Sequence, residues 1–565
     1  MDGEDAVAPI DHKAQRAADV KRIKDSKHPR KVVVAGPGTG KSFLFGELIK
    51  QKRAEGKTSF KAITFIGKLG DALADDLCGL ADTTTMHGLA RELVLRQKPG
   101  WEYYPFIKDV IFEDLKADGV EAPAVGSPEY WEKTEQYAAV GHDDVVHYAI
   151  KLCDGDSGVI PGYDLLLVDE FQDFNEVEAR FVDILASKSE TVIVGDDDQA
   201  LYAFKGSSPS HIRKKHHLTD TEWESHILRY CSRCPEVIIR YFHALVAHYS
   251  LNAVGSEPAD KRISKEYVCY SPENESDSKL KDSRANPQIH LIKDCPPGMI
   301  AFKISKELGQ LIAEQKIKDV LVIGEGQSCA AVLATVAQQL KAKGFKYVDS
   351  RSDERIIPVN DRVIGAYKLL SKNKSSALAW RLLGNPAEAE RKSHLKNTAT
   401  LYTIVNKTPS EIKALRKEDI AALQNVIEHW PSPKTTKAKA SVDAPAELVR
   451  NQVFLGQLKC ENTSLSRPMC NLEITVCNIL NSKGLGADVV FIVGFDMEKF
   501  PATKTPKSSE IYQMLVAITR TKKRLYLVNT IGKSPSSFVE WIPNGDLVTS
   551  SATGKKGSGK KKPAP

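Results

Sequence analysis

Near its start the chain carries the letters VVVAGPGTGKSFLFGELIK, which join a β-branched run to a glycine-rich turn and a helix-forming run. Such a turn at a helix N-terminus lets backbone N–H groups surround a triphosphate, where the helix dipole also favours negative charge. In that geometry Lys41 reaches the β- and γ-phosphates, and the Ser42 hydroxyl becomes a magnesium ligand. Ala35 replaces the first glycine of the strict pattern, so a glycine-rich turn without a ligand stays the alternative. The strand and helix predict a parallel α/β sheet with a nucleotide at its edge.

A second segment, LLLVDEFQD, places two adjacent carboxylates after an apolar run at residues 163–168. The run suits an interior strand, and ligands of open α/β sheets lie at the carboxyl ends of such strands. There Asp169 can hold magnesium while Glu170 orients or deprotonates the attacking water, as phosphoryl transfer requires. A lone acidic pair could be solvated strand-end charge, but the preceding phosphate loop favours the catalytic interpretation.

Two further segments complete an ordered set, VGDDDQALYAFKG at residues 194–206 and VAITRTKKRL at residues 516–525. The first adds a glutamine and aromatic side chains, and the second adds an arginine that can act on a γ-phosphate from another part of the fold. With the loop and the carboxylate pair, these segments predict a motor that uses ATP and Mg²⁺ and couples hydrolysis to movement on a nucleic-acid strand.

In this order the segments resemble the superfamily 1 DNA helicases of the UvrD/Rep/PcrA group, over most of residues 8–532. The resemblance implies that Glu170 is the general base, that Gln199 senses the γ-phosphate, and that Lys41, Arg233 and Arg520 contact it. It implies that ATP is held by Gln15, which would read adenine, and by Gly36, Pro37, Gly38, Thr39, Gly40, Lys41 and Ser42, with Ser42 and Asp169 as magnesium ligands. It implies single-strand contacts from Phe65, Lys68, Thr85, His87, Tyr202, Phe204 and Lys205.

The chain departs from the family pattern around the base and the sugar of the nucleotide. Ser232 replaces a tyrosine that stacks on adenine, and Tyr230 stands two positions away. Gly486 replaces a glutamate that contacts ribose, and Leu480 replaces a histidine. Lys205 replaces an arginine and cannot give that residue's planar two-pronged contact. We therefore expect an active ATPase with looser nucleotide selectivity.

The fold class that we expect is α/β, with two RecA-like parallel-sheet motor domains, each interrupted by a mostly helical insertion. The expected boundaries are residues 1–90 and 155–226 for the first motor domain, 91–154 for the first insertion (1B-like), 227–372 and 462–545 for the second motor domain, 373–461 for a small second insertion (2B-like), and 546–565 for a disordered lysine-rich tail.

Two local patterns each leave two interpretations open. The aromatic cluster in WEYYPF at residues 101–106 favours a small helical core over a strand-binding face. Cys231 and Cys234 form a CxxC pair, but no second pair stands at zinc-site spacing, so a structural role is favoured over a metal or redox role.

Composition agrees with these expectations, since 565 residues with 42% hydrophobic and 27% charged side chains can form several globular domains. No stretch reaches the apolar length of a membrane span and the first residues lack a signal-peptide core, so we expect a cytoplasmic protein with free thiols. The net charge is +6, and five tail lysines within residues 555–562 carry five of these charges. Strand affinity must then come from a local groove or from the tail, for which a role in solubility stays the alternative.

We expect a DNA-dependent ATPase that translocates on single-stranded DNA, 3′ to 5′ by resemblance. It would unwind duplex at single-strand/duplex junctions, alone or with a partner, in DNA repair or phage defence. The alternative is a nucleotide-gated DNA-binding or sensor subunit of a nuclease complex, with little unwinding of its own. Separation of a tailed duplex by the purified protein with ATP distinguishes the two.

Overall fold

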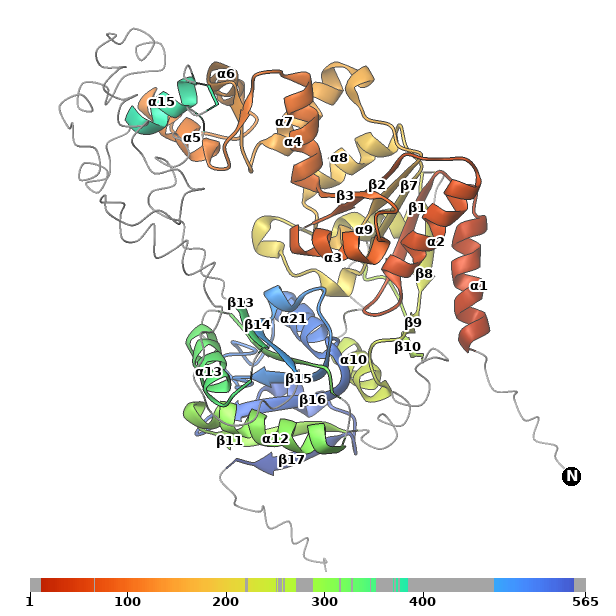
Figure 1. The fold of residues 1–565 in the computed structure, drawn as a ribbon, viewed down its shortest axis with the longest axis vertical. Coiled ribbons are helices and arrows are strands. Elements are labelled where there is room, and N and C mark those ends of the chain that lie inside the picture. The colour runs from red at the N-terminus through yellow and green to blue at the C-terminus, as the bar shows by residue number, and fades with distance from the viewer. Residues whose placement is uncertain are drawn as a thin grey trace, which may run out of the picture. The chain divides into compact units, whose positions relative to one another are not determined.

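The computed structural model describes residues 12–65, 67–218, 222–249, 260–270, 288–314, 317–326, 329–345, 347–351, 376–384 and 472–552, with residues 251, 257, 369, 372 and 373 between them. The chain divides into two compact units. Figure 1 labels helices and strands of both. The larger unit takes the described parts of residues 1–86, 161–353 and 465–565, and the smaller takes those of residues 87–160 and 354–464. Among the described helices, none combines the length and apolarity that crossing a membrane needs.

The first half of the larger unit is a six-stranded parallel sheet in the order β3-β2-β6-β7-β1-β8. Its strands are β1 (Arg30–Ala35), β2 (Phe60–Thr64), β3 (Asp82–Thr85), β6 (Leu165–Val168), β7 (Thr191–Gly195) and β8 (Glu224–Leu228). Its helices are α1 (His12–Asp25), α2 (Lys41–Ala54), α3 (Gly67–Leu77), α8 (Glu176–Ala186) and α9 (Ser210–His217), with short 3-10 turns η2 (Phe171–Asp173), η3 (Asp197–Gln199) and η4 (Ala203–Lys205). Strands β2, β6 and β7 are buried at every residue, as expected where helices cover both faces of a parallel sheet.

The second half is a seven-stranded parallel sheet in the order β13-β14-β12-β15-β16-β11-β17. Its strands are β11 (Ile289–Cys295), β12 (Asp319–Gly324), β13 (Tyr347–Arg351), β14 (Glu473–Asn478), β15 (Ala487–Val493), β16 (Thr521–Thr530) and β17 (Leu547–Ser551). Its helices are α10 (Glu236–His248), α12 (Ile300–Glu314), α13 (Ala330–Ala342) and α21 (Ser508–Ile518), with 3-10 turns η6 (Pro297–Met299), η8 (Leu480–Ser482) and η9 (Ser537–Trp541). Two short strands, β9 (Tyr230–Cys231) and β10 (Val268–Cys269), form a separate parallel pair.

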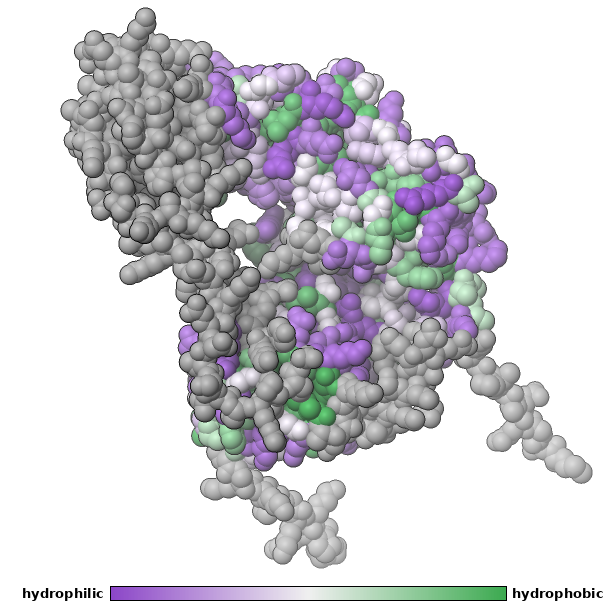
Figure 2. All heavy atoms as spheres, viewed as in Figure 1, coloured by the Kyte–Doolittle hydropathy of each residue, from purple (hydrophilic) through white to green (hydrophobic). Residues whose placement is uncertain are grey.

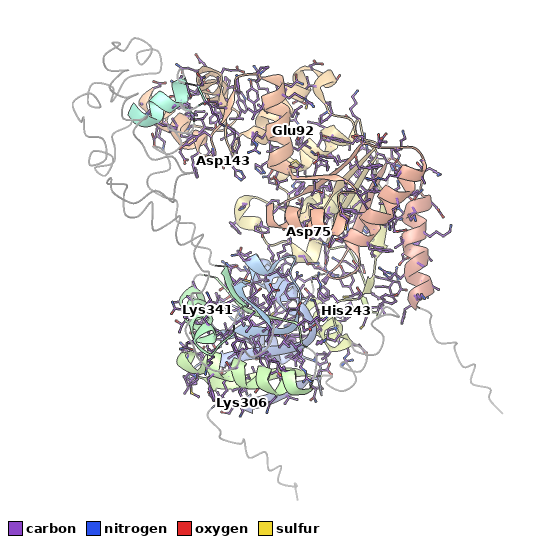
Figure 3. All side chains as sticks on the ribbon, in the orientation of Figure 1. Asp75, Glu92, Asp143, His243, Lys306 and Lys341 are labelled. Carbon is purple, nitrogen blue, oxygen red and sulfur yellow. The ribbon has the colours of Figure 1, made fainter. Side chains whose placement is uncertain are left out.

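Separate apolar cores lie on the two faces of this second sheet. Residues of α10 and α21 pack on one face, and residues of α12 and α13 pack on the other. Lys306 on α12 and Lys341 on α13 point away from the sheet (Figure 3). The visible surface is mainly hydrophilic, with apolar patches between the polar residues (Figure 2). Because both faces of the second sheet are packed, its strands are fixed in place, and so are the starting points of the loops at their carboxyl ends.

The smaller unit is mostly helical. It contains α4 (Met86–Gln97), β4 (Glu102–Tyr103), α5 (Ile107–Ala117), α6 (Pro128–Tyr137), β5 (Ala139–Val140), α7 (Val145–Gly155), η1 (Ser157–Val159) and α15 (Ala377–Gly384). Tyr104 is 4% exposed and packs with α5, α6 and α15. The aromatic cluster thus includes a core residue, while Trp101 and Tyr103 are half-buried.

The α/β fold with two parallel motor sheets is confirmed, and the structure differs from the predicted division of the chain in two boundaries and in the relation of the two insertions. The sequence divides the motor domains at residue 226, but β8 continues to Leu228 because it pairs with β1. The sequence predicts a disordered tail from residue 546, yet Leu547–Ser551 form β17 and pair with β11. The sequence treats the two insertions separately, whereas Leu378 and Leu382 of α15 share the core of the first. Residues 385–471 of the second insertion and the tail lysines lie outside the described residues.

Candidate active site

The turn between β1 and α2 has the backbone of an anion-binding loop. Gly38 and Gly40 have φ of 66° and 93°, values that a residue with a Cβ rarely adopts. The Thr39 hydroxyl folds back and donates to the Gly36 carbonyl at 2.9 Å. Helix α2 begins directly after the turn, so its first N–H groups and the positive end of its dipole face the loop.

Lys41, in the first turn of α2, reaches the carboxylates that follow β6. Its Nζ lies 2.8 Å from Glu170 Oε1. Gln172 donates to the other oxygen, Glu170 Oε2, at 2.6 Å. Glu170 itself sits in the left-handed region with φ of 54°, and the sharp turn aims its carboxylate back at the loop. Such strain in a non-glycine residue is typical of functional sites.

The two neighbouring carboxylates have opposite electrostatic settings. Burial alone would raise the pKa of Glu170, but the cations Lys41 and Lys483 and its hydrogen bonds outweigh that effect and hold the pKa below its ordinary value. Burial raises the pKa of Asp169 above its ordinary value, and the charge of Glu170 adds to the shift. Glu170 is therefore kept ionised, as a base must be, whereas Asp169 lacks enough positive charge nearby.

This arrangement fits a magnesium ion at Asp169. Asp169 Oδ1 accepts the N–H of Glu170 at 2.9 Å, and the described residues supply no hydrogen bond to Oδ2. A buried carboxylate oxygen and the half-buried Ser42 hydroxyl are hard oxygen ligands of the kind that Mg²⁺ prefers. When bound, the ion would supply positive charge for the phosphates and for Asp169.

Arg233 and Arg520, 287 positions apart in sequence, meet at one backbone oxygen. Arg520 Nη1 donates to the Leu485 carbonyl at 3.0 Å and Arg233 Nη1 at 3.4 Å. Arg520 Nη2 also donates to Gln199 Oε1 at 3.2 Å. Burial, aided by the neighbouring Arg233, lowers the pKa of Arg520 to about 9. Two clustered guanidinium groups whose charges repel one another are a ready binding site for a polyanion.

Lys483 is a buried cation in this site that the sequence-based prediction omits. Its Nζ pairs with Asp173, lies 3.4 Å from Glu170 Oε2 and donates to the Gln199 carbonyl at 3.1 Å. It comes from the turn after η8, so it carries charge from the second sheet to the general-base candidate on the first. The signal that could have found it is a lysine in NSKGLG, between two apolar strands.

Replacing Lys483 by methionine is expected to lower the free energy of unfolding by about 3 to 5 kcal/mol, because the substitution leaves Asp173 buried without its cation. The side chains of Lys483 and Asp173 are 1% and 0% exposed. Denaturant titration of both variants provides the measurement, with Lys522→Met as the control, since Lys522 pairs with Asp319 at the surface and its loss should cost at most about 1 kcal/mol. Equal losses for the two variants would contradict this assignment.

The acidic triplet Asp196, Asp197 and Asp198 is a second cluster that only the structure explains. Its oxygens lie close enough to hold a metal, but cations from the chain fill that position. Lys265 Nζ lies 2.7 Å from Asp196 and also pairs with Asp197, and Arg262 donates to Asp198 at 2.6 Å. Asp196 in turn accepts from Gln199 Nε2 at 2.7 Å. The ion-paired triplet thus holds the Gln199 amide with its oxygen toward Arg520.

Three of the residues proposed to contact DNA form an aromatic group, and a fourth, Lys205, lies beside it. Phe65 and Tyr202 have ring centres 4.9 Å apart, and Tyr202 and Phe204 lie 6.0 Å apart. Lys205 Nζ lies 5.7 Å from the centre of the Phe65 ring and 5.5 Å from that of Tyr202. Phe204 is 69% exposed, so most of its ring is open to a stacking partner. A base can therefore stack on this group beside a positive charge.

The other three residues proposed to contact DNA are not part of this aromatic group. Thr85 ends β3, and His87 lies in α4, where its ring stacks on His142 at 4.1 Å. Lys68 lies on α3, and its side chain is outside the described residues.

Truncating Phe204 to alanine is expected to weaken single-strand binding by about 1 to 3 kcal/mol, since one stacked base is lost. Fluorescence anisotropy with a labelled oligothymidylate at fixed salt measures the change. The matched control is Phe302→Ala, because Phe302 is also exposed, at 48%, but lies on α12 of the second sheet. An unchanged affinity for Phe204→Ala would place the strand elsewhere.

The CxxC pair is buried on either side of Arg233. Cys231 and Cys234 are buried free thiols, and the Cys234 N–H donates to Cys231 Sγ at 3.4 Å. Within the described residues the cluster of possible metal ligands is the aspartate triplet, which includes no cysteine. The pair brackets Arg233, which supports the structural interpretation.

Two family models match the chain. The UvrD/REP helicase N-terminal domain matches residues 122–220, and the UvrD-like helicase C-terminal domain matches residues 226–531. The second alone spans more than half of the chain, and it contains both arginines of the candidate site.

Curated relatives of low overall identity are also named as DNA helicases. A DNA helicase II of Haemophilus influenzae is 25% identical over 409 residues, covering 64% of this chain and 54% of the relative. An ATP-dependent DNA helicase PcrA of Staphylococcus epidermidis is 23% identical over 494 residues, covering 76% of this chain and 65% of the relative. A putative ATP-dependent DNA helicase YjcD of Bacillus subtilis is 52% identical, over 48 residues only. The chain spans about half to two thirds of the length of the first two relatives.

Proposed function

Since this chain belongs to the UvrD/Rep/PcrA family of superfamily 1 helicases, we propose that it hydrolyses ATP in response to single-stranded DNA and moves along that strand. The observation that carries the proposal is the link from Arg520 through Gln199 and Lys483 to Glu170, which Lys41 also contacts. Groups from both sheets meet there, so one nucleotide can bias the arrangement of both.

Each residue then has a defined task. Lys41 and the loop N–H groups hold phosphate oxygens, and Glu170 takes a proton from the attacking water. Arg233 and Arg520 stabilise the charge that develops on the transferred phosphoryl group. Gln199 reports that charge to the segment that carries Tyr202 and Phe204, because residues 199–204 are continuous in the chain.

Movement follows if the grip on the strand changes with the state of the nucleotide. In the aromatic group, Phe65 directly follows a strand of the first sheet, and Tyr202 and Phe204 follow the η3 turn that ends at Gln199. A shift of that turn on hydrolysis would alter the stacking surface and so step the strand. The direction of movement that we propose is 3′ to 5′, with unwinding at single-strand/duplex junctions. A cytoplasmic setting and service in DNA repair or phage defence, beside a nuclease or another partner, belong to the same proposal.

ATP turnover with and without single-stranded DNA tests the function. We expect strong stimulation by an unstructured oligonucleotide and weaker stimulation by a blunt duplex. Strand separation on a 3′-tailed and a 5′-tailed duplex then tests direction. Stimulated turnover without separation of either substrate would favour a nucleotide-gated binding subunit, and turnover that ignores DNA would refute the proposal.

A further inference from the structure

Planar side chains lie next to the C-terminal end of the phosphate loop, where α2 begins. Phe43 follows Ser42 in the first turn of α2 and is 50% exposed. The Arg16 guanidinium carbon lies 5.0 Å from the centre of the Phe43 ring and 5.3 Å from that of Tyr270. Arg16 Nη2 lies 3.0 Å from the position that a Cβ on Gly40 would take. These planar groups thus lie beside the loop that a triphosphate would occupy, and all of them can stack on bases without regard to identity.

Arg16 also has hydrogen-bonding capacity to spare. Its Nε is buried and has no hydrogen-bond partner among the described residues. The same is true of His12 Nδ1, on the preceding turn of α1, whose ring lies 5.7 Å from that of Tyr230. Unpartnered polar atoms beside stacking surfaces indicate a site for a polar ring or for a sugar.

One side chain near these planar groups, Gln15, can distinguish bases by its hydrogen bonds, and one end of its amide already has a partner. The Tyr230 hydroxyl donates to Gln15 Oε1. A glutamine that selects adenine uses both ends of its amide, accepting from N6 and donating to N7. The Tyr230 hydroxyl takes one of the two lone pairs of the Gln15 oxygen and so draws that end of the amide toward Tyr230, while the NH₂ group keeps its donors to offer. Such a donor suits N7, which adenine and guanine share, and also suits guanine O6.

Ser232 and Gly486, which also lie near this site, add no further selectivity for the base. The Ser232 hydroxyl donates to the Gly38 carbonyl at 3.0 Å, so it is directed at the loop itself. Gly486 has no side chain, and a Cβ there would lie 3.2 Å from Arg233 Nε. Neither position can reject a base by leaving a buried polar group unpaired, which is how sites reach high discrimination.

We propose that the site takes purine nucleoside triphosphates as a class and hydrolyses GTP as well as ATP, because Tyr230 competes with adenine N6 for the Gln15 oxygen while the Gln15 NH₂ group suits either purine. This inference rests on the proposed function, since it concerns the same site. Phosphate contacts set the affinity, stacking on Phe43, Arg16 and Tyr270 holds any base, and the Gln15 NH₂ group favours purines over pyrimidines.

The test compares kcat/KM for ATP, GTP and UTP on the full chain with saturating single-stranded DNA. We expect GTP to lie within about tenfold of ATP, a difference below 1.4 kcal/mol, and UTP to be clearly poorer. Tyr230→Phe keeps the ring and frees Gln15 Oε1, so the ratio of ATP to GTP should rise by about tenfold or more. The control Tyr249→Phe removes a hydroxyl at the end of α10 and should leave the ratio unchanged.

A second variant and a second readout keep the outcome decisive. Gln15→Ala should lower ATP and GTP together, so that the preference over UTP shrinks. Displacement of a fluorescent adenosine nucleotide by ATP or GTP measures selectivity without any turnover. Preference for ATP above about 100-fold, or an unchanged ratio in Tyr230→Phe, would overturn the inference. If DNA stimulates ATP turnover alone, the inference fails and the proposed function stands; if it stimulates none, the function fails and displacement still decides selectivity.

Discussion

Replacing Glu170 by glutamine is expected to lower ATP turnover by about 10²- to 10⁴-fold, the usual contribution of a general base. The amide keeps the size of the side chain, and Lys41 and Gln172 remain beside it. Nucleotide affinity should therefore change little. Lys41→Ala should also abolish turnover, but with a loss of affinity, because the lysine holds phosphate oxygens whereas the carboxylate acts on water. Turnover and equilibrium nucleotide binding, measured on both variants, separate the two roles.

A matched control exists on the same sheet. Glu190 pairs with Lys31 and Lys52 at the start of β7, the edge opposite the loop. Glu190→Gln should turn over ATP at the normal rate. Near-normal turnover in Glu170→Gln would mean that another group activates the water, and Asp169 would then be the nearest carboxylate to examine.

Arg520→Ala should lower turnover by at least about 10³-fold, with a smaller effect on nucleotide affinity, since trans-acting arginines serve the transition state. The Arg520 guanidinium already contacts Gln199 and shares the Leu485 carbonyl with Arg233. The pair should act as a unit, so the double variant should be little worse than either single one. Arg520→Lys should recover only part of the loss, because lysine lacks the planar fork.

Stability must be checked beside activity for this variant. Arg520 is 1% exposed and also donates to the Val516 carbonyl at 2.9 Å, so its loss leaves polar backbone unpaired. Arg240→Ala is the control: Arg240 lies on α10 and pairs with Glu236 and Asp546, and its replacement should leave turnover unchanged. If Arg520→Ala kept normal turnover while remaining folded, the two sheets would not share one ATP site.

The local parts of the candidate site could be predicted because short segments specify them. Gly38 and Gly40 supply the positive φ angles of the loop, and the apolar run before Asp169 forms β6. Each of these features depends on the conformational preferences of a few adjacent residues, so letters alone sufficed. Both parallel sheets could be predicted for the same reason, from apolar runs separated by helical patterns.

The contacts between distant charges could not be predicted in this way. Lys483 and Asp173 pair across 310 positions, and Lys265 finds Asp196 across 69. A lysine beside a glycine, or three aspartates in a row, is compatible with solvent exposure, with metal binding and with buried pairing. Burial decides among these, because an ion removed from water must be compensated, and burial depends on the whole fold.

By itself the sequence determined the phosphate loop, the carboxylate pair, the two arginines and the family to which the chain belongs. The tertiary structure alone decided that Arg233 and Arg520 meet at one carbonyl, that Tyr230 donates to the Gln15 oxygen, and that β17 completes the second sheet. The reason is that backbone geometry within a segment depends on neighbouring residues, whereas a hydrogen bond between segments depends on how the sheets and loops bring its donor and acceptor within about 3 Å.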